Sequence, residues 1–144
     1  MENDSNHKPT AKVLFVEDSP ENRDFIEDFM KIEAPEIEVR LSTDEENRSL
    51  AEFDKKLCVD VIILDFWLDG ITGLQILRRI RQSGNPNFDT PVIFLPGNRN
   101  DLGDEAARDR LFEEMNVIGI FQKGLVINTI IGRIRDWMRS SEDQ

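Results

Sequence analysis

Residues 58–65 have the sequence Cys-Val-Asp-Val-Ile-Ile-Leu-Asp and form the most apolar run in the chain. A short run of β-branched and aliphatic residues predicts a strand that is buried on both faces of a sheet. The run stops at Asp65, so a carboxylate follows directly after the last apolar residue. We therefore expect a central strand of a parallel sheet, with Asp65 at its carboxyl end.

Strands and helices alternate on both sides of this run. The sequence predicts further strands at residues 12–17, 36–41, 90–95 and 117–121. It predicts a first helix from Pro20 to Ala34 and further helices at residues 43–56, 72–82, 104–115 and 126–138. Such alternation indicates βαβ units with right-handed crossovers. We expect an α/β fold, a doubly wound five-stranded parallel sheet with five helices, and the flavodoxin-like strand order 2-1-3-4-5 fits this count.

The length of 144 residues fits one compact domain. Residues 1–10 are polar and predict a flexible N-terminal tail. The alternating pattern covers residues 11–139, and residues 140–144 are expected to form a short C-terminal tail. We find no internal repeat or linker, so a second domain is not predicted.

Composition excludes several classes of function. The net charge of −11 argues against direct binding to nucleic acid. No apolar run is long enough to cross a bilayer or to act as a signal peptide, so we expect a cytoplasmic protein without a membrane partner. Cys58 and His7 are the only cysteine and histidine, which excludes an intramolecular disulfide and histidine-based triads. Any metal would therefore be held by oxygen ligands.

Charged residues follow three of the predicted strands. Glu17 and Asp18 follow the first, Asp65 the third and Lys123 the fifth. In an open α/β sheet, ligands bind at the carboxyl ends of the strands, so these groups should converge. Carboxylates at 4 Å repel by about 4 kcal/mol at an effective dielectric near 20, and a cation relieves that cost. Oxygen ligands suit Mg²⁺, and the lysine suits a phosphate. The alternative is that the acids are helix N-caps, as Asp18 before Ser19 could be.

Four segments together resemble the response-regulator receiver domain of two-component signalling, over about residues 11–139. The first strand with its acidic pair matches, as does the run from Ile62 to Gly73, where a glycine stands eight residues after the acceptor aspartate. The segments Pro91–Leu95 and Gly119–Lys123 are similar to the family's fourth and fifth strands. The order and spacing of these pieces make the resemblance specific.

The resemblance implies a role for each matching residue. Asp65 would accept a phosphoryl group from a histidine kinase or a phosphotransfer protein. Glu17, Asp18, Asp65 and the backbone carbonyl of Trp67 would bind Mg²⁺, and Lys123 would contact the phosphoryl group. Such a domain promotes only its own phosphorylation and slow dephosphorylation and is otherwise not an enzyme. It signals to a downstream protein partner, in some members as a homodimer through the fourth and fifth helices.

The chain departs from the family pattern at three positions. Pro96 stands where the family has a threonine or serine that donates a hydrogen bond to the phosphoryl group, although the next residue, Gly97, is small as expected. Ile120 stands where the family has an aromatic switch residue, and Phe121, one place later, should face the other side of the strand. Gly124 replaces a proline that follows the lysine. The coupled motion of hydroxyl and ring therefore lacks both partners.

Two hypotheses from different classes follow. The first is a phosphorylatable receiver with an unusual output switch, in which Asn98 is a candidate substitute for the missing hydroxyl. The second is a pseudo-receiver, a phosphorylation-independent protein-interaction module. A phosphatase is a third and weaker reading, since Trp67 stands where a second acid, two residues after Asp65, would be needed.

Overall fold

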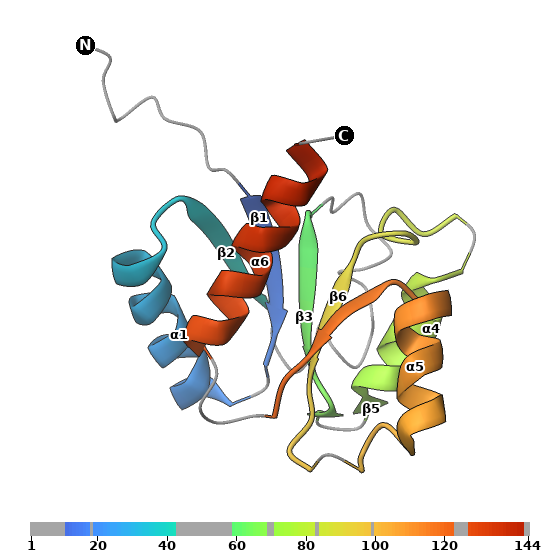
Figure 1. The fold of residues 1–144 in the computed structure, drawn as a ribbon. Coiled ribbons are helices and arrows are strands. Elements are labelled where there is room, and N and C mark those ends of the chain that lie inside the picture. Colours follow the sequence, from blue (N-terminus) through green and yellow to red (C-terminus); the bar gives the residue numbers. More distant parts are fainter. Residues whose placement is uncertain are drawn as a thin grey trace.

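The computed structural model describes residues 11–17, 19–42, 59–68, 71–82, 84–98, 100–122 and 127–142. Its main sheet has five strands, β1 (Ala11–Val16), β2 (Ile37–Ser42), β3 (Val61–Asp65), β6 (Val92–Leu95) and β7 (Val117–Ile120). They lie in the order β2-β1-β3-β6-β7, and every pairing is parallel (Figure 1). The predicted doubly wound sheet and its flavodoxin-like order are confirmed.

Four helices connect the strands within the described residues: α1 (Pro20–Glu33), α4 (Gly73–Ile80), α5 (Glu105–Glu114) and α6 (Ile127–Glu142). The helix predicted at residues 43–56 lies outside the described residues. Helix α6 continues to Glu142 and so includes residues that we expected in a C-terminal tail. No described helix is long and apolar enough to cross a membrane.

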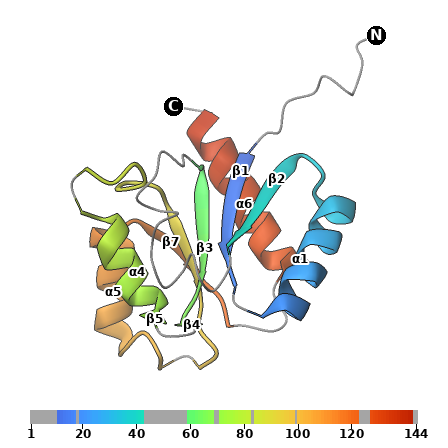
Figure 2. The ribbon, with the colours of Figure 1, turned by 180° about the vertical axis from the view of Figure 1, so that it is seen from behind.

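The helices cover both faces of the sheet, as Figures 1 and 2 show from opposite sides. Helices α1 and α6 pack on one face, where Ile26 and Ile134 join a buried apolar cluster with residues of β1, β3 and β6. Helices α4 and α5 pack on the other face, around Leu77 and Leu111. Because both faces are covered, every residue of β3 and β6 is buried. This explains the uninterrupted apolar runs in the sequence.

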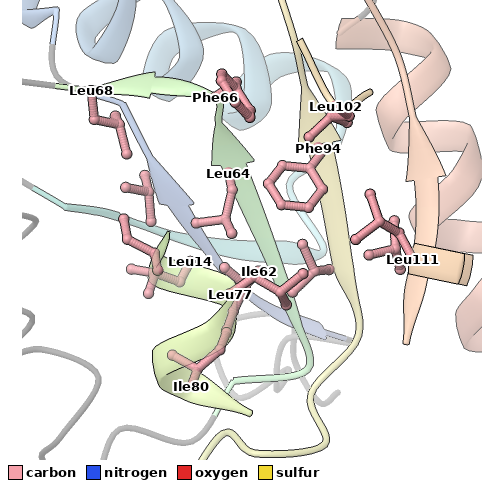
Figure 3. Packing of buried hydrophobic residues seen from close by; sticks show 14 residues of the cluster. Leu14, Ile62, Leu64, Phe66, Leu68, Leu77, Ile80, Phe94, Leu102 and Leu111 are labelled. Atoms are coloured by element: carbon pink, nitrogen blue, oxygen red, sulfur yellow. The ribbon is translucent and has the colours of Figure 1, made fainter. Parts of the chain in front are cut away.

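Helix α4 shows how the sequence period sets the packing. Ile76, Leu77 and Ile80 are spaced so that they share one side of the helix, and each is fully buried. Figure 3 shows Leu77 and Ile80 next to Leu14 and Ile62 from the central strands. The helix begins at a capping box, in which Thr72 and Gln75 each bind the other's backbone N–H. A well-defined start for α4 also defines the end of the loop that leaves Asp65.

A small antiparallel hairpin, not predicted from the sequence, lies between β3 and α4. Strand β4 (Trp67–Leu68) pairs with β5 (Ile71–Thr72). Two strands of two residues are too short to show a period in the sequence, which is why the pattern did not reveal them. The hairpin lies at the carboxyl edge of the main sheet (Figure 1).

Strand β7 contains a β-bulge. Val117 pairs with Val92, but the next residue of β6, Ile93, pairs with Gly119, so Ile118 is an extra residue. The carbonyl oxygen of Ile118 accepts a hydrogen bond of 2.7 Å from Nε of Arg133 on α6. The bulge reverses the alternation of faces along the strand, and it therefore decides which side chains of β7 face α5.

At the amino edge of the sheet, Arg81 holds together the loop that connects α4 to β6. Its guanidinium group donates to the carbonyl oxygens of Met115 (2.9 Å), Thr90 (2.6 Å) and Asn87 (3.1 Å). Burial lowers the pKa of Arg81, while the charge of Asp89 acts in the opposite direction. The guanidinium group stays protonated in proteins, so Arg81 is a permanent multiple donor at the base of the fold.

Candidate functional site

The site is built from the carboxyl ends of two neighbouring strands. Val16 of β1 pairs with Leu64 of β3, so the residues that follow, Glu17 and Asp65, lie side by side. Each of these two acids is only 2% exposed. Buried carboxylates at adjacent positions repel each other, and that repulsion needs a nearby cation or hydrogen-bond donors to offset it. The predicted convergence of the two acids is thus present in the fold.

The turn after β1 is tied to the first turn of α1. Ser19 is the N-cap of this helix, and its side chain accepts a hydrogen bond from the N–H of Asn22 at 3.4 Å. The backbone N–H of Ser19 donates in turn to the Glu17 carboxylate at 3.2 Å. Serine therefore fills the capping role, so the alternative that an acid is the N-cap of α1 is not needed to explain the acidic pair.

Arg23 also contacts this turn. Its Nη1 donates to the backbone carbonyl oxygen of Glu17 at 2.9 Å. The sequence analysis did not single out Arg23. The signal was present in the spacing, because Arg23 lies one helical turn after Ser19 and a helical side chain points back toward the N-terminus.

The backbone around Asp65 is tightly packed. The N–H of Gly73 donates to the carbonyl oxygen of Phe66 at 2.7 Å and so closes the loop that contains the β4–β5 hairpin. A Cβ atom at position 73 would lie 3.0 Å from Cε1 of Phe94. The loop is therefore held against the sheet, with no room for a side chain at its closing residue.

Several predicted site residues lie outside the described part of the chain. These are Asp18 of the acidic pair, Lys123 after β7 and Gly124. The backbone of Trp67 is described and belongs to β4, directly after Phe66. The roles assigned to these residues stay predictions.

The described residues fit a hard cation in part. Within the described ranges, no group of three or more histidine, cysteine or acidic side chains gathers closely enough to hold a metal ion. Glu17 and Asp65 nevertheless supply two buried carboxylates at one sheet edge. Mg²⁺ in proteins commonly binds one or two carboxylates and completes its shell with water and phosphate oxygens. The chemistry of this donor pair therefore suits Mg²⁺.

Pro96 occupies the predicted switch position at the end of β6. Leu95 pairs with Asp65, and Pro96 follows it directly and is buried. Gly97 is exposed, and a Cβ there would meet nothing within 4 Å. The side-chain oxygen of Asn98 accepts a hydrogen bond from the N–H of Asn100 at 2.9 Å, and its role as a substitute donor stays a prediction.

Ile120, at the second predicted switch position, is the last residue of β7. Ile120 is half-buried and packs on the cluster beneath α4 and α5, whereas Phe121 packs on the cluster beneath α1 and α6. The prediction that Phe121 faces the other side is confirmed. An isoleucine cannot swing in and out of a pocket as a planar ring does, so the usual aromatic switch has no counterpart at this position.

A shallow pocket lies next to these two positions. It has a volume of about 280 Å³, and its lining residues come from α5, β7 and the ends of β6 and β7: Pro96, Arg108, Phe112, Ile120 and Gln122. Phe112 of α5 is 46% exposed although it is large and apolar. The end of the acceptor's neighbouring strand is thus connected to an apolar hollow on the surface.

The arginines of α6 are used within the fold. Arg133 holds the bulge of β7, and Nε of Arg135 forms an ion pair of 2.8 Å with Glu36. This hydrogen bond lowers the pKa of Glu36 and raises that of Arg135. Arg133 and Arg135 of α6 thus both make contacts within the molecule.

Comparison with known proteins agrees with this arrangement. Residues 13–134 match the family model of the response regulator receiver domain. The transcriptional regulatory protein TrcR of Mycobacterium tuberculosis is 28% identical over 135 residues, which cover 90% of this chain and 46% of TrcR. The chain thus spans less than half the length of this curated relative.

Solved structures show the same fold. The CheY-like receiver domain protein of Methanospirillum hungatei superposes with a TM-score of 0.70 at 13% identity, covering 95% of this chain and 98% of that one. The non-phosphorylated HemR receiver domain of Leptospira biflexa has a TM-score of 0.64 at 22% identity, with 91% and 94% covered. Because the family model extends over most of the sequence, the chain belongs to the response regulator receiver domain family.

Proposed function

We propose that this receiver domain accepts a phosphoryl group on Asp65 in a Mg²⁺-dependent reaction and signals through an unusual output switch. The observation that carries the proposal is the burial of Glu17 and Asp65 side by side at the carboxyl edge of the sheet. Two adjacent buried acids are costly unless a cation or an incoming group uses them.

The donor is the phosphohistidine of a histidine kinase or a phosphotransfer protein. A carboxylate oxygen of Asp65 attacks phosphorus opposite the P–N bond. That bond breaks, its electron pair returns to the imidazole, and an acyl phosphate forms on Asp65. Water later attacks the phosphorus and releases inorganic phosphate and the free carboxylate. The domain thus catalyses only the gain and slow loss of its own phosphoryl group.

Each residue has a part in this chemistry. Glu17, Asp18, Asp65 and the carbonyl oxygen of Trp67 would hold the metal ion, and Lys123 would contact the phosphoryl oxygens. A Mg²⁺ ion held there would supply positive charge to offset that of the phosphoryl group. The buried position of Asp65 limits the access of water. The loop with the β4–β5 hairpin follows Asp65 directly in the chain. The hydrogen bond from the N–H of Gly73 to the carbonyl oxygen of Phe66 closes this loop and so supports the position of Asp65.

Output passes through the hollow between α5 and β7. Pro96 cannot donate a hydrogen bond, and Ile120 cannot act as a rotating ring, so the event reaches the surface by movement of the β6 end against Phe112. A downstream partner would bind there. Homodimerisation through α5 and α6 is the second arrangement, and the internal contacts of the α6 arginines support it less.

The kinase would approach along α1. Phe25, Phe29 and Ile32 are spaced along one side of this helix, and Phe25 and Ile32 are 59% and 74% exposed. The rings of Phe25 and Phe29 contact each other with centroids 5.7 Å apart. The helix begins beside Glu17, so a partner seated on the stripe reaches the acceptor. We place this exchange in the cytoplasm.

Intact mass spectrometry tests the central step. The protein is incubated with Mg²⁺ and a small-molecule phosphodonor, alongside Asp65→Asn and the matched surface variant Asp109→Asn. We expect one added phosphoryl group in the wild type and in Asp109→Asn, and none in Asp65→Asn or without Mg²⁺. Phosphate release is recorded in parallel, because rapid turnover would hide the adduct. A folded wild type that neither gains nor releases phosphate favours the phosphorylation-independent interaction module.

A further inference from the structure

We infer that Arg23 is a positioning residue of the metal and phosphoryl site: it holds the turn after β1 through the backbone of Glu17. The inference rests on the proposed function, since it concerns the same site. Arg23 belongs to the fourth position of α1, and its Nη1 donates to the Glu17 carbonyl oxygen at 2.9 Å.

The place of Arg23 contradicts a local rule. The N-terminus of a helix carries partial positive charge, so a cation in the first turn is unfavourable there and an acid is favourable. Glu21 follows that rule and Arg23 does not. A residue that breaks a local preference needs a compensating contact, and such residues gather at functional sites. The hydrogen bond from Arg23 to the backbone of Glu17, a member of the buried acidic pair, is such a contact.

Three side-chain hydrogen bonds contribute to this turn, and the one from Arg23 is the shortest, at 2.9 Å. The other two join Ser19 to Asn22 at 3.4 Å and Ser19 to Glu17 at 3.2 Å, and both distances are long. Hydrogen bonds from a charged donor are stronger than neutral ones. Arg23 therefore restrains the backbone from which the Glu17 carboxylate projects, together with the N–H of Ser19.

Two effects of removing Arg23 have opposite signs, and this makes the inference testable. If Arg23 acted only through its charge, its removal would tighten Mg²⁺ binding, because a competing cation would be gone. If it positions Glu17, its removal loosens the turn and weakens Mg²⁺ binding. We expect the second effect, because Nη1 of Arg23 donates to the backbone carbonyl oxygen of Glu17 and so restrains the turn.

The experiment measures Mg²⁺ dissociation constants by calorimetry for the full chain. It compares the wild type with Arg23→Met, which loses charge and donors, and with Arg23→Lys, which keeps the charge but loses the planar group of donors. Lys31→Met is the matched control, since it removes one exposed positive charge from the same helix. We expect both Arg23 variants to bind Mg²⁺ about tenfold more weakly, the loss of one charge-assisted hydrogen bond, and Lys31→Met to bind as the wild type does.

Phosphorylation rates at varied Mg²⁺ concentration give a second readout. The Arg23 variants should need more Mg²⁺ for half-maximal rate and keep their maximal rate, a division that general destabilisation does not produce. If the Arg23 variants do not fold, Ser19→Ala loosens the same turn and should raise the dissociation constant in the same direction.

The inference is overturned if Arg23→Met binds Mg²⁺ more tightly than the wild type, or if Arg23→Lys binds it as the wild type does. It is also overturned if the Mg²⁺ dissociation constant is unchanged in both Arg23 variants. Where those variants do not fold, an unchanged dissociation constant in Ser19→Ala overturns it. A wild type that neither binds Mg²⁺ nor gains phosphate overturns the proposed function together with it. A wild type that does both, with variants that match it, overturns the role of Arg23 alone.

Discussion

Gly73 packs directly against the backbone of Asp65: a Cβ atom at position 73 would lie 2.5 Å from the carbonyl oxygen of the acceptor residue. Real Cβ atoms are almost never found so close to an oxygen, and the obstructing atom belongs to the backbone of a buried strand end. The position of the acceptor therefore depends on the absence of a side chain eight residues later.

Gly73→Ala should destabilise the protein by about 1–3 kcal/mol, the range for overpacking a well-packed site. The new methyl group must displace Asp65 or the ring of Phe94, so the rate of phosphorylation should fall as well. Chemical denaturation and the phosphodonor assay measure the two effects.

Gly132→Ala is the matched control for this substitution. It lies within α6, and a Cβ there would meet nothing within 4 Å. Replacing glycine by alanine inside an open helix position stabilises by about 0.5–1 kcal/mol. Opposite signs for the two variants are expected, and equal stability of Gly73→Ala and the wild type would contradict the steric account.

Pro96→Thr should restore part of the missing switch. A hydroxyl donor to the charged phosphoryl group contributes about 1.5–3 kcal/mol, a quarter to a half of the 5.5 kcal/mol or so that a complete population shift requires. Hydrogen exchange in α5 and β7 should then differ more between the phosphorylated and unphosphorylated forms than it does in the wild type.

Pro96→Val has the shape of threonine without the hydroxyl group and also regains the backbone N–H. An equal response in the valine and threonine variants would show that the backbone, and not the hydroxyl group, transmits the event.

Phe25→Ala should weaken transfer from a cognate kinase about tenfold or more and leave transfer from a small-molecule phosphodonor unchanged, since truncating an aromatic anchor in an interface commonly costs more than 1 kcal/mol. The side chain is 59% exposed, so folding should be little affected. Phe88→Ala is the control, because Phe88 is 54% exposed in the loop before β6, at the opposite edge of the sheet. Equal loss in both variants would argue against docking on α1.

The ion pair between Glu36 and Arg135 should make a small, pH-dependent contribution to stability. The hydrogen bond from Arg135 lowers the pKa of Glu36 below its ordinary 4.5. A carboxyl group whose pKa is lower in the folded state stabilises the fold above the unfolded pKa, and this contribution is lost as the pH falls through the folded pKa. Both side chains are partly exposed, so a double-mutant cycle with Glu36→Gln and Arg135→Gln should give about 0.2–1 kcal/mol at pH 7. The coupling free energy should vanish once the pH falls below the folded pKa of Glu36. A coupling free energy that is the same at neutral and acidic pH would contradict a pH-dependent ion pair.

Arg81→Met should cost at least about 2 kcal/mol, because it leaves several partly buried carbonyl oxygens without a donor. The neighbouring Arg78 is exposed, and Arg78→Met should stay within about 0.5 kcal/mol of the wild type. Urea denaturation compares the two variants. Arginine stays charged at these pH values. The difference in the free energy of unfolding between the two variants should therefore be the same at about pH 6 and about pH 8.

The period of the apolar residues was sufficient to predict the five strands and the described helices, and the flavodoxin-like strand order fitted their count without following from the period. Element ends were less predictable. The third strand begins at Val61 rather than Cys58, and Asp60, just before it, bonds to the backbone of Lys12 at the amino edge through its N–H and its side chain. The hairpin after Asp65 and the loop held by Arg81 depend on contacts between residues far apart in sequence, which no local pattern contains.

For the site, strand ends identified Glu17 and Asp65, but spacing alone did not reveal Arg23 or the packing role of Gly73. The face of Phe121 shows the limit of counting. If side chains simply alternated between faces from Val117 onward, Phe121 would lie on the α5 side of the sheet. Counting back from Lys123 instead puts Ile120 at the switch position and Phe121 on the other side. The extra residue Ile118 decides between the two, and a bulge has no sequence signature of its own.

The hydrogen bond from Arg133 to Ile118 bears on whether β7 can shift its register against β6. A slip of β7 by one residue would exchange the faces of Ile120 and Phe121 and so put an aromatic ring beside Pro96. During such a slip, Ile118 would have to join the ladder of hydrogen bonds between β6 and β7. Its carbonyl oxygen already accepts the hydrogen bond of 2.7 Å from Arg133 of α6. The contact with α6 therefore stabilises the bulged register of the edge strand, because a slip would have to break this hydrogen bond.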